Sequence, residues 1–215
     1  MNFCNGKIQK KEMSNMDAVL YIHGKGGSAE EAEHYRALFP SCEVLGLDYQ
    51  TFTPWETGRE IHEATVELKK KYDKVILIAN SVGAFFSMNA ESEGYIDHAY
   101  FISPIVDMEK LIVNMMAWAG IDEKTLKERG NIPTSFGEDL SWEYLCYVRN
   151  HPIRWHVPTD ILMGSEDHLT DIATVKSFCK TRGASLTVME GGEHWFHTPE
   201  QMRFLDVWIK EKSGQ

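Results

Sequence analysis

An apolar run of strand length ends abruptly at a serine in the first half of the chain. Residues 74–79 read Lys-Val-Ile-Leu-Ile-Ala, and Asn80, Ser81, Val82 and Gly83 separate them from a helix-like run of small and aromatic residues. This pattern predicts a sharp turn from a strand into a helix, with the Ser81 hydroxyl exposed at its apex. The alternative is an ordinary helix-capping serine, because Ser-x-Gly recurs by chance in many proteins.

Apolar runs of strand length alternate along the chain with segments of helical spacing. The runs are 18–23, 44–47, 74–79, 99–103, 159–163 and 186–189. Such alternation predicts a mostly parallel sheet with helices on both faces, in the α/β class. The pattern also predicts amphipathic helices over 56–72 and 199–210. Residues 1–16 are polar, and we expect an edge strand or a mobile segment there.

The connection between the fourth and fifth runs is far longer than an ordinary crossover. It contains more than fifty residues without a convincing strand. Helical patterns cover 106–119, 122–129 and 141–150. We expect one domain over 1–215, with 104–158 as a helical insertion. The insertion is rich in methionine and aromatic side chains, which line adaptable apolar pockets or simply pack helices together.

Composition excludes several classes of partner. The chain has 22 Lys and Arg residues against 32 Asp and Glu residues, and its net charge of −10 has the wrong sign for binding nucleic acid. Nowhere do 18 apolar residues run together, so we expect no membrane span, and the N-terminal residues lack the apolar segment of an export signal. The four cysteines are scattered, which favours reduced thiols and a cytoplasmic location.

Cofactor-binding patterns are also missing from the sequence. Residues 24–28 read Gly-Lys-Gly-Gly-Ser, but a phosphate-binding loop requires Gly-Lys-Ser/Thr in immediate succession after a four-residue gap. His151, His156 and Asp160 are loosely spaced among prolines and do not match a zinc site. We therefore expect neither a metal nor a cofactor.

Four features follow one another along the chain: a glycine-rich turn at 24–27, the Ser81 turn, an acid at Asp167 and a histidine at His194. This order resembles the α/β-hydrolase superfamily of serine hydrolases, over roughly 17–212. The family's serine turn reads Gly-x-Ser-x-Gly, and here Ala79 replaces the first glycine, the smallest change available. The resemblance implies an α/β-hydrolase fold, with 104–158 as a cap over the nucleophile.

In this family a serine nucleophile is activated by a histidine base, which an acid orients. Ser81, His194 and Asp167 would take these roles. Each follows a predicted strand, and the carboxyl ends of parallel strands meet at one edge of the sheet. The competing residues are His168 and His197 for the base, and Glu166 and Asp107 for the acid.

The resemblance also implies an oxyanion hole, with the N–H groups of Val82 and Lys25 as donors and Gly26 as the alternate to Lys25. Four residues of the insertion are expected to bind substrate: Met115, Trp118, Trp142 and Tyr147. These features predict a hydrolase acting on carboxylic esters of small or medium, mainly apolar molecules. Thioester or amide cleavage, acyl transfer and a catalytically silent binding module are the alternatives. The pattern does not indicate an oligomeric state.

Overall fold

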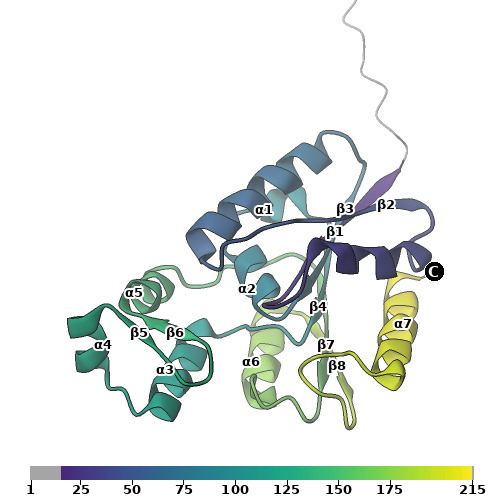
Figure 1. Ribbon diagram of the computed structural model, residues 1–215. Helices are drawn as coiled ribbons and strands as arrows, with labels where there is room; N and C mark the ends of the chain where they lie inside the picture. Colours follow the sequence, from purple (N-terminus) through teal and green to yellow (C-terminus); the bar gives the residue numbers. More distant parts are fainter. Residues whose placement is uncertain (1–15, 215) are drawn as a thin grey trace, which may run out of the picture.

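A single parallel sheet of six strands forms the centre of the molecule, in the order β2-β1-β3-β4-β7-β8 (Figure 1). The computed structural model describes residues 16–214, so the expectation for 1–16 lies outside the described residues except at Met16. The strands are β1 (Asp17–Ile22), β2 (Cys42–Gly46), β3 (Val75–Asn80), β4 (His98–Ile102), β7 (Thr159–Gly164) and β8 (Ser185–Met189). All five pairings between these strands are parallel, which confirms the predicted fold class.

Helices cover both faces of the sheet because alternate side chains of each strand point to opposite sides. Leu77 and Phe101 belong to an apolar cluster on the face that carries α1, α2 and α6, whereas Ile78 and Tyr100 face η1 and α7. These helices are η1 (Ala29–Ala37), α1 (Pro54–Lys69), α2 (Val82–Met88), α6 (Ile172–Arg182) and α7 (Pro199–Ser213), with the short η2 (Glu93–Tyr95) before β4. The expected helices over 56–72 and 199–210 correspond to α1 and α7.

Local sequence signals set the ends of these helices. Thr198 and Gln201 form a capping box at the start of α7, in which each side chain accepts a hydrogen bond from the other residue's backbone N–H. The C-terminal end of α6 is set by Gly183, whose φ of 72° lies in the left-handed region that favours glycine. These signals limit α6 and α7 to lengths that pack against the sheet.

The connection between β4 and β7 contains α3 (Met108–Ala119), α4 (Glu123–Arg129) and α5 (Trp142–Asn150). The expectation that it holds no strand is wrong, because β5 (Asn131–Pro133) and β6 (Asp139–Ser141) form an antiparallel hairpin. Each strand has only three residues, too few to give a recognisable alternation in the sequence. In Figure 1 the whole insertion lies to one side of the sheet, beyond α2.

Ion pairs and aromatic contacts are among the interactions that attach the insertion to the rest of the chain. The Lys25 ammonium group pairs with Glu138 in the hairpin. Lys110 of α3 pairs with Asp171 at the start of α6, with 2.8 Å between Nζ and Oδ2. The Trp55 ring of α1 packs against aromatic rings of α5. Polar contacts therefore hold the hairpin and α3, and an aromatic contact holds α5.

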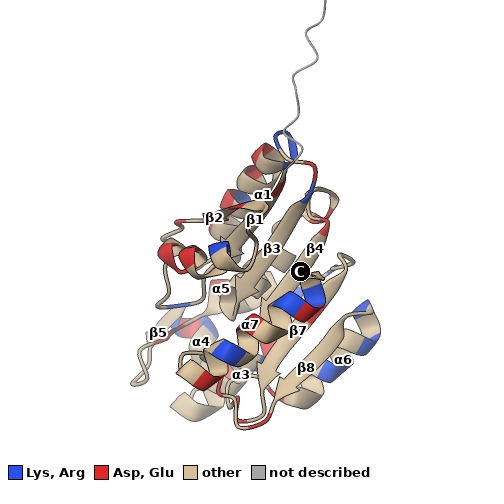
Figure 2. Ribbon diagram, turned by 90° about the vertical axis from the view of Figure 1, so that its right-hand side faces the viewer, with Lys and Arg blue, Asp and Glu red and all other residues tan. Residues whose placement is uncertain are grey.

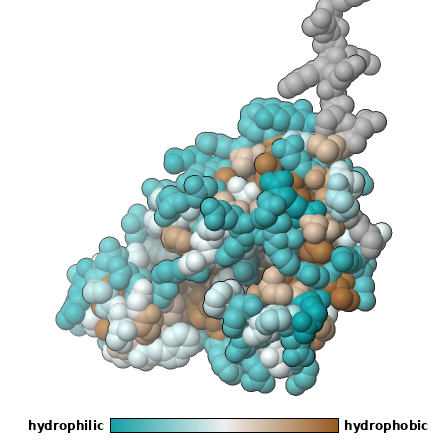
Figure 3. Space-filling view, turned by 45° about the vertical axis from the view of Figure 1, so that its right-hand side comes forward, coloured by the Kyte–Doolittle hydropathy of each residue, from teal (hydrophilic) through white to brown (hydrophobic). Residues whose placement is uncertain are grey.

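Charged residues lie mostly on helices and loops, while the strands carry few of them (Figure 2). The face shown in Figure 3 is largely hydrophilic, with small separate hydrophobic areas. Among residues 16–214, no helix has the length and apolar character needed to cross a membrane.

A polar cluster joins the amino ends of three strands, at the opposite end of the sheet from Ser81. Asp160 of β7 accepts hydrogen bonds from Ser185 of β8, from Lys212 of α7 at 2.9 Å and from His98 of β4 at 2.9 Å. Burial alone would raise the pKa of this carboxyl group, but the hydrogen bonds from Ser185 and Lys212 outweigh it and lower the pKa. The ionised carboxylate therefore stabilises the folded state.

We expect Asp160→Asn to lower the free energy of unfolding by about 1–2 kcal/mol near pH 7, because charge-assisted hydrogen bonds are lost. The pKa of Asp160 is lower in the folded than in the unfolded chain, so its stabilising effect is complete above about pH 4 and is lost as the pH falls further. Urea unfolding of both proteins at pH 7 and pH 3 measures the difference. A difference that stays constant down to pH 3 would contradict this role for the carboxylate.

Candidate active site

Ser81 lies at a sharp turn between β3 and α2. Its φ of 52° and ψ of −118° form a backbone conformation that residues with side chains rarely adopt. The turn is held on both sides of the serine, because the Ser81 N–H donates to Ile102 O at 2.9 Å and the Ser81 carbonyl accepts from Ile105 N at 3.2 Å. The neighbouring strand β4 and the residues after it thus keep the hydroxyl at the carboxyl edge of the sheet.

Close packing beneath the turn requires a glycine at 83. A Cβ atom there would lie 2.4 Å from His23 O and 2.7 Å from Ile22 O, so α2 begins directly against the end of β1. Ala79 is fully buried between its partners Ile22 and Phe101 in the sheet. Its methyl group is accommodated where the resembling family has glycine.

His194 and Asp167 meet Ser81 at this edge. The Ser81 hydroxyl lies 2.8 Å from His194 Nε2, and His194 Nδ1 lies 2.8 Å from Asp167 Oδ2. Because an ionised carboxylate only accepts, Nδ1 carries the proton and Nε2 is left to accept a hydrogen bond from Ser81. The geometry is that of a nucleophile, a base and an orienting acid.

The surroundings of Asp167 fix its carboxylate. Its side chain has no exposed surface, whereas 24% of the His194 side chain is exposed. Asp167 Oδ1 accepts hydrogen bonds from the backbone N–H groups of Leu169 at 2.9 Å and Thr170 at 3.0 Å. One oxygen is therefore held by the backbone while the other orients the imidazole.

The competing residues lie in other environments. Asp107 caps α3, with its side chain accepting from Lys110 N at 2.9 Å. His197 stacks on the Trp195 ring and donates to the Trp195 carbonyl, 2.7 Å from Nδ1. Glu166 and His168 are exposed. The structure brings Ser81, His194 and Asp167 together and leaves these four residues outside the hydrogen-bonded chain.

Residues 24–27 form a tight turn beside the serine. Gly27 N donates to Gly24 O at 3.2 Å, and Gly26 has a φ of 78°. A Cβ atom added at Gly24 would lie 3.2 Å from Ser81 Cβ, so this turn touches the serine turn. Within residues 16–214, the N–H groups of Lys25 and Val82 have no hydrogen-bond partner. Both are available to a negatively charged oxygen bound next to Ser81.

An apolar cavity of about 160 Å³ opens at Ser81, Val82 and Lys25. Four of its lining residues form one stripe of α3, at i, i+3, i+4 and i+7: Met108, Leu111, Ile112 and Met115. The remaining ones are Phe52, Ile105, Glu138, Asp139, Leu140, Ser141, Tyr144 and Leu169. The apolar stripe on α3 is visible in the sequence, but only the docking of the insertion turns it toward Ser81.

Of the four residues expected to bind substrate, Met115 alone lines this cavity. Trp118 is 57% exposed and packs edge-on against the Phe136 ring of the hairpin. Trp142 lies beneath the Lys127 ammonium group, and Tyr147 packs against Trp55 and stacks on His151. The structure places these three aromatic residues outside the lining of this cavity, where they contact other parts of the insertion, α1 or solvent.

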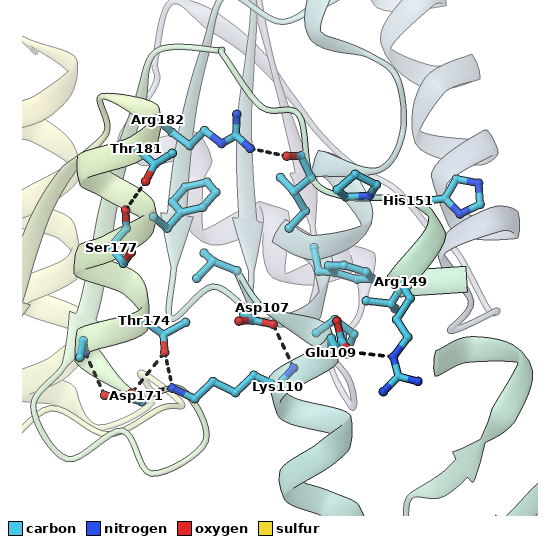
Figure 4. Close-up of a pocket in the computed structure, with 18 residues that line it drawn as sticks. Asp107, Glu109, Lys110, Arg149, His151, Asp171, Thr174, Ser177, Thr181 and Arg182 are labelled. Carbon is cyan, nitrogen blue, oxygen red and sulfur yellow. Dashed lines mark hydrogen bonds and ion pairs between the residues drawn. The ribbon is translucent and has the colours of Figure 1, made fainter. Parts of the chain in front are cut away.

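A larger cleft of about 640 Å³ lies between the insertion and α6 (Figure 4). Its charged side chains pair with one another, as in Lys110 with Asp171 and Arg149 with Glu109 at 2.7 Å. The cleft contains none of the residues of the Ser81–His194–Asp167 chain. The smaller cavity is therefore the one positioned for chemistry at Ser81.

Contact between two loops aligns the acid with the histidine. A Cβ atom at Gly164 would lie 2.0 Å from Gly192 O, and Glu166 N donates to that same carbonyl at 2.8 Å. The loop with Asp167 and the loop with His194 therefore touch directly. In the described part of the chain, no group of three or more His, Cys, Asp or Glu residues has the arrangement of a metal site.

The parallel sheet, the serine turn after β3 and the insertion after β4 together define the α/β-hydrolase fold. Solved structures with this fold match nearly the whole chain. Est1E from Butyrivibrio proteoclasticus has a TM-score of 0.72 at 19% sequence identity, with 95% of this chain and 89% of that chain covered. Mouse alpha/beta hydrolase domain-containing protein 10 has a TM-score of 0.70 at 13% identity, with 92% and 89% covered.

An esterase from Pyrococcus furiosus is also similar, with a TM-score of 0.59, 20% identity and coverage of 94% of this chain and 81% of that one. No protein-family model and no curated protein sequence matches the chain. The likeness is thus one of fold, which the α/β-hydrolase resemblance in the sequence had indicated.

We expect Gly83→Ala to lower the free energy of unfolding by about 1–3 kcal/mol, because the added methyl group collides with backbone carbonyl groups of the β1 end. Gly94→Ala is the matched control, since a Cβ atom there would meet nothing within 4 Å. Urea unfolding followed by circular dichroism compares the two variants with the wild type. Equal stability of the two variants would show that the serine turn is less tightly packed than described.

Proposed function

We propose that the protein is a serine hydrolase that cleaves carboxylic esters of small or medium, mainly apolar molecules through an acyl-enzyme intermediate. The observation that carries the proposal is the hydrogen-bonded chain from Ser81 through His194 to the buried Asp167. A serine hydroxyl is a weak nucleophile, and a base at 2.8 Å with a fixed tautomer is the arrangement that activates it. The fold shared with known esterases and hydrolases supports the same class of reaction.

In the first half of the reaction, Ser81 Oγ attacks the ester carbonyl carbon while His194 Nε2 takes the hydroxyl proton. The negative charge that develops on the carbonyl oxygen is met by the N–H groups of Val82 and Lys25, which have no protein partner. Asp167 stabilises the positive imidazole without taking its proton. The tetrahedral intermediate then collapses, and the leaving alcohol departs with the proton from His194.

In the second half, water takes the place of the alcohol. His194 removes a proton from the water as its oxygen attacks the acyl carbon, and the acid product leaves when Ser81 regains its proton from His194. The acyl group lies in the cavity beside Ser81, whose walls are mainly aliphatic side chains. The small volume of this cavity, about 160 Å³, suits a small or medium acyl group.

The organisation of the chain fits the same proposal. Residues 104–158 act as a cap within one domain, since α3 and the hairpin supply most of the cavity wall next to Ser81. We also propose a cytoplasmic location. Cys42, Cys146 and Cys179 are free thiols, which suits a reducing compartment, whereas Cys4 lies outside the described residues.

We expect Ser81→Ala to lower kcat by more than about 10³-fold on a chromogenic ester, because the nucleophile is lost. Ser213→Ala, at the end of α7, is the control and should retain full activity. Matched oxygen esters, thioesters and amides with one acyl group determine which bond is preferred. Equal turnover by the wild type and Ser81→Ala would reject Ser81 as the nucleophile, and no turnover by either would reject a serine esterase and favour a silent binding module.

We expect wild-type kcat/KM to be highest for short or medium acyl chains, because the cavity beside Ser81 is small and mainly aliphatic. Met115→Trp should shift this optimum to shorter chains by reducing the space beside α3. Trp118→Ala removes a larger side chain of the same helix that points away from the cavity, and should leave the optimum unchanged. A shift in Trp118→Ala and none in Met115→Trp would place the acyl group elsewhere.

A further inference from the structure

The peptide group between Gly24 and Lys25 is held firmly from its carbonyl side. Gly24 O accepts one hydrogen bond from His23 Nδ1 at 2.8 Å and another from Gly27 N at 3.2 Å. In a trans peptide, the N–H points away from the carbonyl of the same plane. Fixing Gly24 O therefore also fixes the direction of the Lys25 N–H, one of the two N–H groups assigned to the oxyanion hole.

The imidazole that makes this hydrogen bond is itself held by Tyr49. The two rings are stacked, with 4.0 Å between their centroids and 8° between their planes. The Tyr49 hydroxyl also donates to His23 O at 2.5 Å. Tyr49 thus contacts His23 at both its side chain and its backbone, although it lies on a different segment, after β2. Rotation of the imidazole away from Gly24 O would break the stacking.

Tyr49 is in turn rigidly placed. It is 1% exposed, and its ring packs edge-on against Phe86 of α2 at 6.0 Å and 90°. The pKa of its phenol is raised, mainly by burial and also by the Glu31 carboxylate, so the hydroxyl stays protonated and donates. The His23 carbonyl that accepts this hydrogen bond is the one packed against Gly83 under the serine turn.

We propose that Tyr49 is a positioning residue for catalysis, acting through His23 to aim the Lys25 N–H at the oxyanion. The proposal rests on the proposed function, since it concerns the transition state of that reaction. Tyr49 does not touch the reacting atoms. Its effect is confined to the step in which charge develops on the carbonyl oxygen, because a preorganised donor is worth most there.

We expect Tyr49→Phe to lower kcat about tenfold with KM within about twofold of the wild type. Loss of a whole oxyanion donor typically costs 10²–10³-fold, and this variant only loosens one. Phenylalanine keeps the ring that stacks on His23 and removes a single hydroxyl. Tyr72→Phe is the matched control, because it removes the hydroxyl of another tyrosine, which donates to Glu43 away from the serine turn.

The decisive readout compares an ester with its thionoester, in which sulfur replaces the carbonyl oxygen and accepts hydrogen bonds poorly. Wild type and Tyr72→Phe should prefer the oxygen ester by the same factor. Tyr49→Phe should prefer it several-fold less, because part of the oxyanion contact is already lost. A purely structural defect would lower both rates alike and leave the ratio unchanged.

The outcomes separate this proposal from the proposed function. Turnover that requires Ser81, together with an unchanged kcat and ester preference in Tyr49→Phe, would overturn the role of Tyr49 alone. Absence of any turnover that depends on Ser81 in the wild type would overturn both. Circular dichroism of each variant at the assay temperature verifies that it is folded, so a fall in kcat without unfolding and with a reduced ester preference supports the assignment.

Discussion

The contact between the start of α2 and the end of β1 is the constraint on which the rest of the site depends. Gly83 packs so closely against the carbonyl groups of Ile22 and His23 that no side chain fits between them. The chain can make this contact only by turning sharply, which leaves Ser81 with a positive φ at the edge of the sheet. The same contact brings the 24–27 turn against the serine, so the Ser81 hydroxyl and the unpaired N–H groups of Lys25 and Val82 lie together.

Two further contacts extend this arrangement across the sheet edge. Gly164 and Gly192 bring the loops after β7 and β8 into direct contact, and the buried Asp167 carboxylate holds His194 in one tautomer. Neither loop is long, and each starts from a strand whose register is set by the parallel sheet. The hydrogen-bonded chain from Ser81 to Asp167 is therefore attached to the carboxyl ends of β3, β7 and β8.

The insertion after β4 differs from the sheet in how well its role could be inferred. Its three helices were predictable, because their caps and periodicity are local. Its aromatic residues were misleading, since Trp118, Trp142 and Tyr147 are large enough to line a pocket yet pack away from it. Which face of a helix meets the nucleophile depends on how the insertion docks, and local pattern does not encode that.

The sequence alone specified the succession along the chain of the six strands of the parallel sheet and the residue types at Ser81, Asp167 and His194, because hydrophobic periodicity and turn glycines act over short distances. Only the tertiary structure decided that these three side chains meet at 2.8 Å, and that Asp107 and His197 do not join them. Only the tertiary structure shows that Tyr49 donates a hydrogen bond to His23, and that α3 lines the cavity beside Ser81. The physical reason is that contacts across strand ends depend on sheet order and register, which arise only when the whole sheet assembles.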